Sequence, residues 1–217
     1  MPFAAVGHVV AGSADTNNVT TGTLDTTGAT LLVLVLSNYN AVATTISDSK
    51  GNTWTALTGF NQASNAHCRI YWSVPTSVGS GHTFTASSTA GYPSISVSAF
   101  SGPVRTSPAD QQNGAGGASA LSVGSVTPTE DNELLVTGVC CWTSGGGVGP
   151  SSVDAGFTFS VSILMDAVPN HYGGGSAYKI QTTAAAVNPA WTTTASVNAA
   201  VIATFRVARG SGMLLCF

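Results

Sequence analysis

Ser47 and Lys50 stand three positions apart in the stretch TTISDSKGNTWTAL, residues 44–57. Some acyl-transfer enzymes use this Ser-x-x-Lys spacing, in which the lysine helps to deprotonate the serine hydroxyl. In the same stretch Asp48 and Asn52 carry side-chain oxygens of the kind that bind a cation. A third interpretation is structural, because Asp, Ser and Gly are the residues that form turns. Residues elsewhere in the chain distinguish among these three interpretations: catalysis, a cation site and a turn.

Other residues with chemical potential are scattered along the sequence. The four histidines lie at positions 8, 67, 82 and 171, too far apart to suggest a metal-ligand spacing. His67 and His82 sit at strand ends and could approach each other across neighbouring strands. The only glutamates, Glu130 and Glu133, lie in TPTEDNELLV, which has the pattern of a turn leading into a strand. We therefore predict no catalytic residue, no metal site and no cofactor, and the two opposed carboxylates that a glycosidase needs are not indicated.

Aromatic residues beside Asn, His and Gly give a different indication. Tyr39, Tyr92 and Trp142 have this setting, and so does the segment PNHYGGGSAY, residues 169–178. Rings with nearby polar groups can stack on sugars and bind their hydroxyls, although each ring taken singly also fits a packing role. The sequence predicts a loop here and a small-ligand site whose residues are Asn170, His171, Tyr172 and Tyr178.

Composition excludes some classes of function. Only 7% of the 217 residues are charged, the net charge is −3 and there are six Lys plus Arg, whereas an ordinary soluble domain has about 25% charged residues. No basic stripe can follow a phosphate backbone, so we expect no nucleic-acid partner. The apolar fraction of 43% is enough for a large core.

Membrane insertion and export are also not indicated. The longest apolar run, LLVLVL at residues 31–36, is far shorter than the ~20 residues of a membrane-spanning helix. The N-terminal residues lack the basic and apolar regions of a secretory signal, so we expect a soluble protein that is not exported by the usual route.

The four cysteines predict free thiols, because no pair has the Cys-x-x-Cys spacing of a metal or redox motif. Cys140 and Cys141 are adjacent in an expected strand and must point to opposite faces, which predicts that at most one of them is in the core.

The apolar segments are short, rich in Val, Ile, Thr and aromatic residues, and bounded by Gly, Pro, Asn or Ser, which predicts strands and no helix. Strands are expected at residues 30–37, 53–57, 67–74, 82–87, 94–100, 133–142, 157–164, 176–183, 190–195 and 199–207. In SISVSAF, residues 94–100, apolar and serine residues alternate, which predicts one face in a core and a serine face in solvent.

The same order of strands occurs twice. Residues of matching type recur at offsets between 103 and 107, with a Gly/Ser/Ala-rich joint at residues 113–120. The matched pairs are Leu31 with Leu134, Trp54 with Phe159, Tyr71 with Tyr178, Phe84 with Trp191, and Phe100 with Phe205. We predict an internal duplication, with pseudo-repeats at about 1–105 and 106–209; chance similarity between two lists of Ser/Thr-rich strands is the alternative.

The predicted duplication favours a turn at residues 44–57 over catalysis. In the second copy SVDAGFTFS replaces SDSKGNTWT: the glycine and the Thr-aromatic pair persist, Lys50 has no counterpart, and Phe157 replaces Asn52. We therefore expect a turn next to a buried aromatic, Trp54, and no catalysis at Ser47 and Lys50.

The C-terminal residues predict a docking segment. After the last strand, Gly210-Ser211-Gly212 forms a hinge before five apolar residues that an isolated domain has no reason to expose. We expect residues 210–217 to form a docking tail whose interface residues are Met213, Leu214, Leu215 and Phe217, with packing against its own sandwich as the alternative. The chain also has only two lysines to protect its edge strands, which suggests that other chains cover them.

The series LLVLVLS, SDSKGNTWT, RIYWSVP, HTFTAS and SISVSAFSG resembles β-sandwich modules of tailed-phage virion proteins and bacterial surface proteins. The resemblance covers most of residues 20–105, recurs more weakly to residue 207, and rests on strand and turn patterns. It implies a jelly-roll or lectin-like antiparallel β-sandwich that serves as a fibre, decoration or adhesive domain, with no catalytic residue.

Together these patterns predict an all-β protein, residues 1–209 forming a jelly-roll-like sandwich with an internal duplication. The expected function is that of a non-enzymatic virion structural protein, a decoration, head-fibre or tail-associated protein. Its expected partners are other copies of itself and capsid or tail proteins, and its expected location is the virion, assembled in the host cytoplasm. The alternatives are a carbohydrate-binding module or adhesin-like domain, which would be extracellular, and a glycan hydrolase.

Overall fold

The computed structural model describes residues 2–12, 16–63, 65–118, 120–144, 149–167 and 170–208, and in these ranges the chain forms strands and no helix. The predicted all-β fold is confirmed. The strands of the first half are β1 (Ala4–Gly12), β2 (Asn18–Thr20), β3 (Leu31–Asn38), β4 (Thr44–Asp48), β5 (Thr55–Ala56), β6 (Phe60–Gln62), β7 (Ala66–Ser73), β8 (Phe84–Ser88) and β9 (Ser94–Ser101). Those of the second half are β10 (Val104–Gly117), β11 (Ala120–Ser122), β12 (Glu133–Thr143), β13 (Pro150–Val153), β14 (Thr158–Ala167), β15 (Asn170–Gln181), β16 (Ala190–Thr193) and β17 (Val197–Val207).

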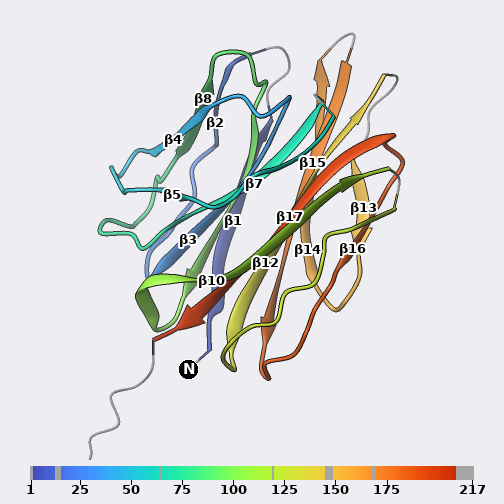
Figure 1. Ribbon diagram of the computed structural model, residues 1–217. Helices are drawn as coiled ribbons and strands as arrows, with labels where there is room; N and C mark the ends of the chain where they lie inside the picture. The colour runs from blue at the N-terminus through green and yellow to red at the C-terminus, as the bar shows by residue number, and fades with distance from the viewer. Residues whose placement is uncertain are drawn as a thin grey trace, which may run out of the picture.

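Each half contains one large and one small antiparallel sheet, with the same strand order in both halves. The first half has the order β1-β9-β3-β7-β5, with β6 also on β7, and the small sheet β2-β8-β4. The second half has the order β10-β17-β12-β15-β14 and the small sheet β11-β16-β13. In Figure 1 the first half, blue to green, and the second half, green through yellow to red, lie side by side. Each half is thus a small β-sandwich of its own.

The two large sheets pack on each other, so the molecule has four layers and three cores. Leu32, Leu34 and Leu36 point into the core of the first half, while Leu31, Val33 and Val35 on the same strand point into the core between the large sheets. A strand buried on both faces has no polar side, which explains the uninterrupted run LLVLVL.

Burial on both faces also corrects the expectation for the cysteines. Cys140 faces the central core and Cys141 the core of the second half, and both are 0% exposed. The rule that neighbouring strand residues point to opposite faces holds, but here both faces are interior. Cys68, Cys140 and Cys141 are free thiols, as predicted, and burial, the largest cause, raises the pKa of each.

The serine face of β9 is interior too, against expectation. Ser96 is 3% exposed, and its Oγ lies 2.5 Å from Oγ of Ser176 on the facing sheet. His8 Nε2 lies 2.8 Å from the same Ser96 oxygen. Ser96 is therefore a polar contact between the two halves and not part of a solvated surface.

Glycines let the two large sheets approach closely. A Cβ on Gly138 would stand 2.2 Å from Cγ1 of Val35, one on Gly174 would stand 2.7 Å from Oγ of Ser37, and one on Gly114 would stand 2.3 Å from Cδ2 of Phe60. This packing corrects two expectations. Residues 113–117 belong to β10 and are not a joint, and residues 170–178 belong to β15 and are not a loop.

The strand registers compare the two halves residue by residue. Leu31 pairs with Phe100 in the first half, and Leu134 pairs with Phe205 in the second, as the predicted offsets require.

Two of the predicted matches are shifted. Val33 pairs with Trp72 and Val136 pairs with Tyr178, so the counterpart of Tyr178 is Trp72 and not Tyr71.

The second shifted match is Phe84 with Trp191. His82 forms an isolated β-bridge with Leu24, and Val187 forms the corresponding bridge with Val126. Phe84 lies two residues after His82, whereas Trp191 lies four residues after Val187. A two-residue shift keeps the same face, and both rings are 0% exposed. The side chain of Phe159 lies outside the described residues. The shared strand order supports a duplication, which stays a prediction.

Candidate functional site

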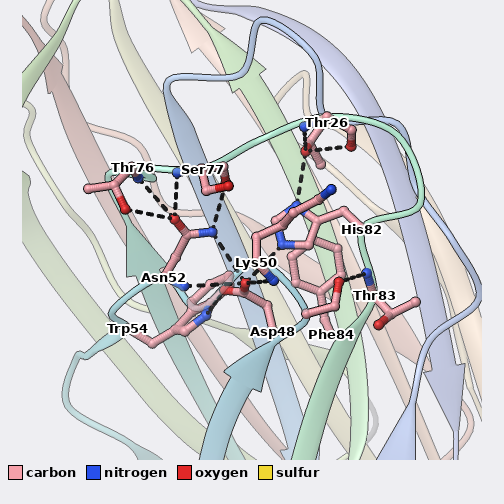
Figure 2. Close-up of polar contacts among 12 residues, drawn as sticks. Thr26, Asp48, Lys50, Asn52, Trp54, Thr76, Ser77, His82, Thr83 and Phe84 are labelled. Carbon is pink, nitrogen blue, oxygen red and sulfur yellow. Dashed lines mark hydrogen bonds and ion pairs between the residues drawn. The ribbon is translucent and has the colours of Figure 1, made fainter.

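The Asp48 carboxylate is the centre of the densest polar cluster in the first half (Figure 2). Asp48 is the last residue of β4, and its side chain is 0% exposed. Trp54 Nε1 donates to Oδ2 over 2.8 Å, and the backbone N–H of Lys50 donates to Oδ1 over 2.8 Å. His82 Nε2 lies 3.0 Å from the same Oδ1, at ion-pair distance. Both carboxylate oxygens are therefore occupied by groups of the protein.

Asn52 extends this cluster to the segment before β8. Its Nδ2 donates to the carbonyl oxygen of Ser77 over 2.9 Å and to Asp48 Oδ1 over 3.3 Å. Its Oδ1 accepts from the backbone N–H groups of Thr76 and Ser77 over 2.9 and 3.0 Å. Because the oxygens of Asp48 and Asn52 already accept from protein donors, they do not form a cation site. In the described part of the chain, no group of three or more His, Cys, Asp or Glu residues gathers as metal ligands.

Thr26, His82 and Asp48 lie in the order hydroxyl, imidazole, carboxylate, the order of a nucleophile, its base and the orienting acid. Thr26 Oγ1 is 2.9 Å from His82 Nδ1. Both residues are 0% exposed, as is the side chain of Asp48. Thr26 Oγ1 also donates to the carbonyl oxygen of Gly79 over 3.2 Å and accepts from its N–H over 3.0 Å. The order resembles a catalytic triad, but the hydroxyl is bound to backbone and no substrate can reach it.

Electrostatics agree with a structural role. Burial by itself raises the pKa of Asp48, but the donors from Trp54, His82, Lys50 and Asn52 outweigh it and hold the pKa below its usual value. The carboxylate is therefore charged at neutral pH and stabilised inside the fold. Sequence reasoning found the turn, placed His82 at a strand end near His67 and missed Thr26. Thr26 and His82 are distant from Asp48 in the chain and reach it only when β8 pairs with β4.

The Ser-x-x-Lys spacing has a turn geometry. Gly51 has φ +75°, and its N–H donates to the carbonyl oxygen of Asp48 over 3.2 Å. Lys50 Nζ donates to the carbonyl oxygen of Ser80 over 3.1 Å, while Ser47 is exposed on β4. A left-handed glycine closes the turn, as its residue types predict.

A pair of carboxyl groups in the second half went unrecognised in the sequence. Asp110 Oδ2 accepts from the N–H and the hydroxyl of Thr129 over 2.9 and 2.8 Å, and its Oδ1 lies 3.8 Å from Arg206. Glu133 is 0% exposed, and its carboxyl group interacts with that of Asp110.

The two carboxyl groups have pKa values shifted in opposite directions. Burial raises the pKa of Glu133, and Asp110 pushes it in the same direction. Burial also raises the pKa of Asp110, but the Thr129 donors outweigh it and leave it lowered. Of the two, Glu133 therefore holds a proton more readily. No local sequence motif indicates this pair, because β10 and β12 are brought near each other only by the folded sheet, in which β17 lies between them.

Of the four predicted ligand residues, Tyr172 and Tyr178 have described side chains, and these two do not contact each other. Tyr172 is 2% exposed; its ring centroid lies 5.7 Å from that of Tyr39, whose centroid is 6.3 Å from that of Tyr92, and Trp142 packs on the same group. Tyr178 lies elsewhere on β15, edge-to-face with Phe100 at 5.3 Å. Asn170 and His171 have described backbones in β15, but their side chains lie outside the described residues. Sequence reasoning thus found an aromatic group but assigned it to a loop that does not exist.

A groove opens where β1 and β14, the edge strands of the two large sheets, lie together. Its volume is about 240 Å³. It is lined by Ala5, Val6, Gly7, His8, Ser98, Phe100, Thr158 and Tyr178.

The predicted docking tail stays a prediction. Met213, Leu214, Leu215 and Phe217, with the whole proposed tail, lie outside the described residues. Among the residues that the structure does describe, no helix has the length and hydropathy to cross a bilayer.

Comparison of the chain with protein-family models, with curated proteins and with solved structures finds no match in any of the three.

Proposed function

We propose that this protein is a non-enzymatic structural protein that assembles through its sheet edges, as a decoration, head-fibre or tail-associated protein of a virion. The observation that carries assembly is β1: an edge strand of nine residues, Ala4–Gly12, without a charged side chain. Long uncharged edges are what monomeric β proteins avoid, because they pair with other chains. The virion as the place of assembly is supported by the resemblance of the strand and turn pattern alone.

The polar clusters support the non-enzymatic part of the proposal. The Thr26, His82 and Asp48 side chains are closed to solvent, and they contact one another through the Thr26–His82 hydrogen bond and the His82–Asp48 ion pair. Glu133 is 0% exposed, whereas the two carboxyl groups of a glycosidase flank a substrate. Both clusters therefore serve the stability of the fold.

The test is the state of association of the full chain over a range of concentrations. We expect light scattering after size exclusion to show dimers or larger species that increase with concentration, and no hydrolysis of glycan or ester substrates. A chain that stays monomeric at every concentration would refute the proposal.

A carbohydrate-binding module is the second candidate, and the aromatic group favours it. Tyr39, Tyr92, Trp142 and Tyr172 come from four separate segments and meet at one place. Tyr39, Tyr92 and Trp142 are half-buried around the buried Tyr172, and half-buried rings can stack on sugars. Binding on a glycan array that is lost in Tyr92→Ala, with the fold retained, would favour this candidate over the structural one.

A further inference from the structure

We propose that Asn113 is a site of spontaneous deamidation, and that its loss as an amide loosens the core of the second half. Asn113 is followed by Gly114, and this is the one Asn-Gly dipeptide of the chain. Asparagine is among the thermolabile residues of proteins. The inference goes beyond the proposed function and does not depend on assembly, because it rests on the contacts of β10.

The backbone nitrogen of Gly114 is held beside the side-chain amide of Asn113. Its N–H donates to Asn113 Oδ1 over 2.8 Å. Oδ1 is bonded to Cγ, the carbon that this nitrogen attacks in deamidation, and the hydrogen bond draws electron density away from that carbon. Glycine has no Cβ, so no side chain crowds the nitrogen and the backbone can adopt the dihedral angles that ring closure needs.

The reaction needs no reagent other than water. The Gly114 nitrogen loses its proton and forms a bond to Cγ, and the bond between Cγ and Nδ2 breaks as Nδ2 takes up a proton and leaves as ammonia. Water then adds to one of the two carbonyl carbons of the resulting succinimide ring and opens it. The product is aspartate or isoaspartate, and no atom is oxidised or reduced.

The position of Asn113 in the sheet leaves it open to this chemistry. β10 is an edge strand, and Asn113 is partly exposed. The register of β10 against β17 shifts between Ala109 and Gln112, and residues 114–117 include three glycines. Glycines weaken a strand, so local opening requires less free energy here than in a central strand. Such opening gives the dipeptide the freedom to close the ring.

The packing requires glycine at position 114. A Cβ on Gly114 would stand 2.3 Å from Cδ2 of Phe60 and 2.7 Å from the carbonyl oxygen of Ala200. A larger residue would push the two halves apart at this point. The close contact between the halves therefore keeps an unhindered nitrogen next to Asn113.

Asn113 has a structural task of its own. Its Nδ2 donates to the carbonyl oxygen of Ser125 over 2.9 Å, and a Cβ on Gly124 would stand 2.7 Å from the same Nδ2. The side-chain amide thus holds the segment that carries Val123 and Val126, both buried in the core of the second half.

Deamidation removes the donor that makes this contact. A carboxylate only accepts hydrogen bonds, so an oxygen in place of Nδ2 would face the Ser125 carbonyl oxygen with no proton between them. The isoaspartate product also adds a carbon to the backbone of β10 and disturbs its ladder with β17. Both products therefore lower the stability of the second half.

Incubation of the unmodified full chain at alkaline pH tests the site, because the reaction begins with loss of the Gly114 amide proton. Peptide mass mapping should find the replacement of NH2 by OH first at Asn113. Labelling by an isoaspartyl methyltransferase should identify isoaspartate there, and the incubated chain should melt at a lower temperature. An Asn113 that stays intact in the folded chain, while the urea-unfolded chain is modified there, would overturn the proposal.

Asn40 is a matched control within the same chain. The N–H of Ala41 donates to Asn40 Oδ1 over 2.8 Å, the same contact at the same distance, but Ala41 carries a Cβ. Asn40 should therefore be modified more slowly than Asn113. Equal or faster modification at Asn40 would overturn the argument from glycine.

Two substitutions separate the reaction from its consequence. Asn113→Gln keeps an amide donor but has to close a larger ring, so it should stay unmodified and keep its melting temperature during incubation. Asn113→Asp supplies the product directly and should melt below the fresh unmodified chain. If Asn113→Asp melts with the unmodified chain, the structural consequence is wrong. If Asn113→Gln loses stability on incubation as the unmodified chain does, another site is responsible.

Discussion

The turn after β4 in the first half and the turn after β13 in the second both begin at an aspartate, but their backbones and their contents differ. Gly51 N–H donates to Asp48 O over 3.2 Å, and Phe157 N–H donates to Asp154 O over 3.3 Å. Gly51, at φ +75°, is the last residue of its turn, whereas Gly156, also at φ +75°, is the third residue of its turn and follows Ala155 at φ +57°. Both halves thus use Asp and Gly to reverse the chain, with the left-handed residues at different places in the turn.

The space beside each turn is filled in opposite ways. In the first half Asp48 is buried among Trp54, His82 and Asn52, a polar network. In the second half Asp154 only accepts from the exposed N–H of Ala190 over 2.7 Å, and Phe157, 8% exposed, packs into the core. Buried polar networks and apolar groups of similar volume can stabilise a fold equally well, but removing one member of a network leaves its partners buried without a hydrogen bond.

The lysine beside each turn also comes from a different position in the two halves. The sequence gives Lys50 no counterpart, yet Lys179 Nζ donates to the carbonyl oxygen of Ala155 over 2.9 Å in the second turn. Lys50 reaches Ser80 from within its own turn, whereas Lys179 comes from β15. A cation beside the turn is thus supplied from different places in the two halves.

The largest expected difference is between the two tryptophans. Trp191 is 0% exposed and donates to Thr137 Oγ1 over 3.1 Å, so Trp191→Ala should lower the free energy of unfolding by about 4 kcal/mol. Trp54, expected to be fully buried, is only partly buried, and Trp54→Ala should cost about 2 kcal/mol, including the donor that Asp48 loses. Urea unfolding of both variants measures the difference, and equal losses would contradict the account of the two halves.

The aspartates should differ next. Asp48→Ala leaves Trp54 Nε1, His82 Nε2 and backbone donors without an acceptor inside the fold, at about 3 kcal/mol. Asp154→Ala removes an acceptor from an exposed donor and should cost about 1 kcal/mol. Similar losses in chemical denaturation would show that the network around Asp48 adds nothing beyond the turn.

The two halves should respond to pH in opposite directions. His67, 4% exposed and 2.6 Å from Asn38 Oδ1, has its pKa lowered by burial, and less so by Arg69, to about 4. The unfolded chain binds this proton more readily, so stability falls as pH drops from about 6.5 to 4, by on the order of 2–3 kcal/mol. Glu133, with its raised pKa, stabilises the fold while protonated, and this contribution is lost as pH rises through its folded pKa.

Thermal melting across pH 4–9 checks both limbs of that profile. His67→Gln should flatten the acid limb, and Glu133→Gln, which keeps a donor for Asp110 without titrating, should flatten the alkaline limb. A variant that flattens the opposite limb would mean that the wrong group has been assigned.

The smallest effects belong to the residues that first suggested catalysis. Lys50→Ala and Lys179→Ala each remove one exposed hydrogen bond, and Ser47→Ala removes an exposed hydroxyl, so each should change stability by about 0.5 kcal/mol or less. Assembly should also be unchanged in all three. Loss of assembly in Lys50→Ala, with the melting temperature retained, would return this turn to the list of functional sites.

Local chemistry in the sequence determined the strands and the turns. The run LLVLVL fits either a strand buried on both faces or part of a buried helix, and its flanking turn residues favour the strand. The matching of Leu31 with Leu134 and of Phe100 with Phe205 followed from residue types, and the structure adds that Leu31 pairs with Phe100 and Leu134 with Phe205. The strands β1 and β10 went unpredicted, since Gly-rich and mixed segments carry little alternation.

Only the tertiary structure decided where the faces of those strands point. The serines of β9, Cys140 and the glycines of β15 have the same local pattern whether they face solvent or a second sheet. They are interior because the two large sheets pack together, a contact made by residues about 80 or more positions apart, such as Ser96 with Ser176. The Asp48 cluster has the same origin: the sequence specified the turn, and the pairing of β8 with β4 brought His82 and Thr26 to it. Pairing between residues far apart in the chain leaves no pattern in the local sequence, so the Asp48 cluster could be recognised only in the folded structure.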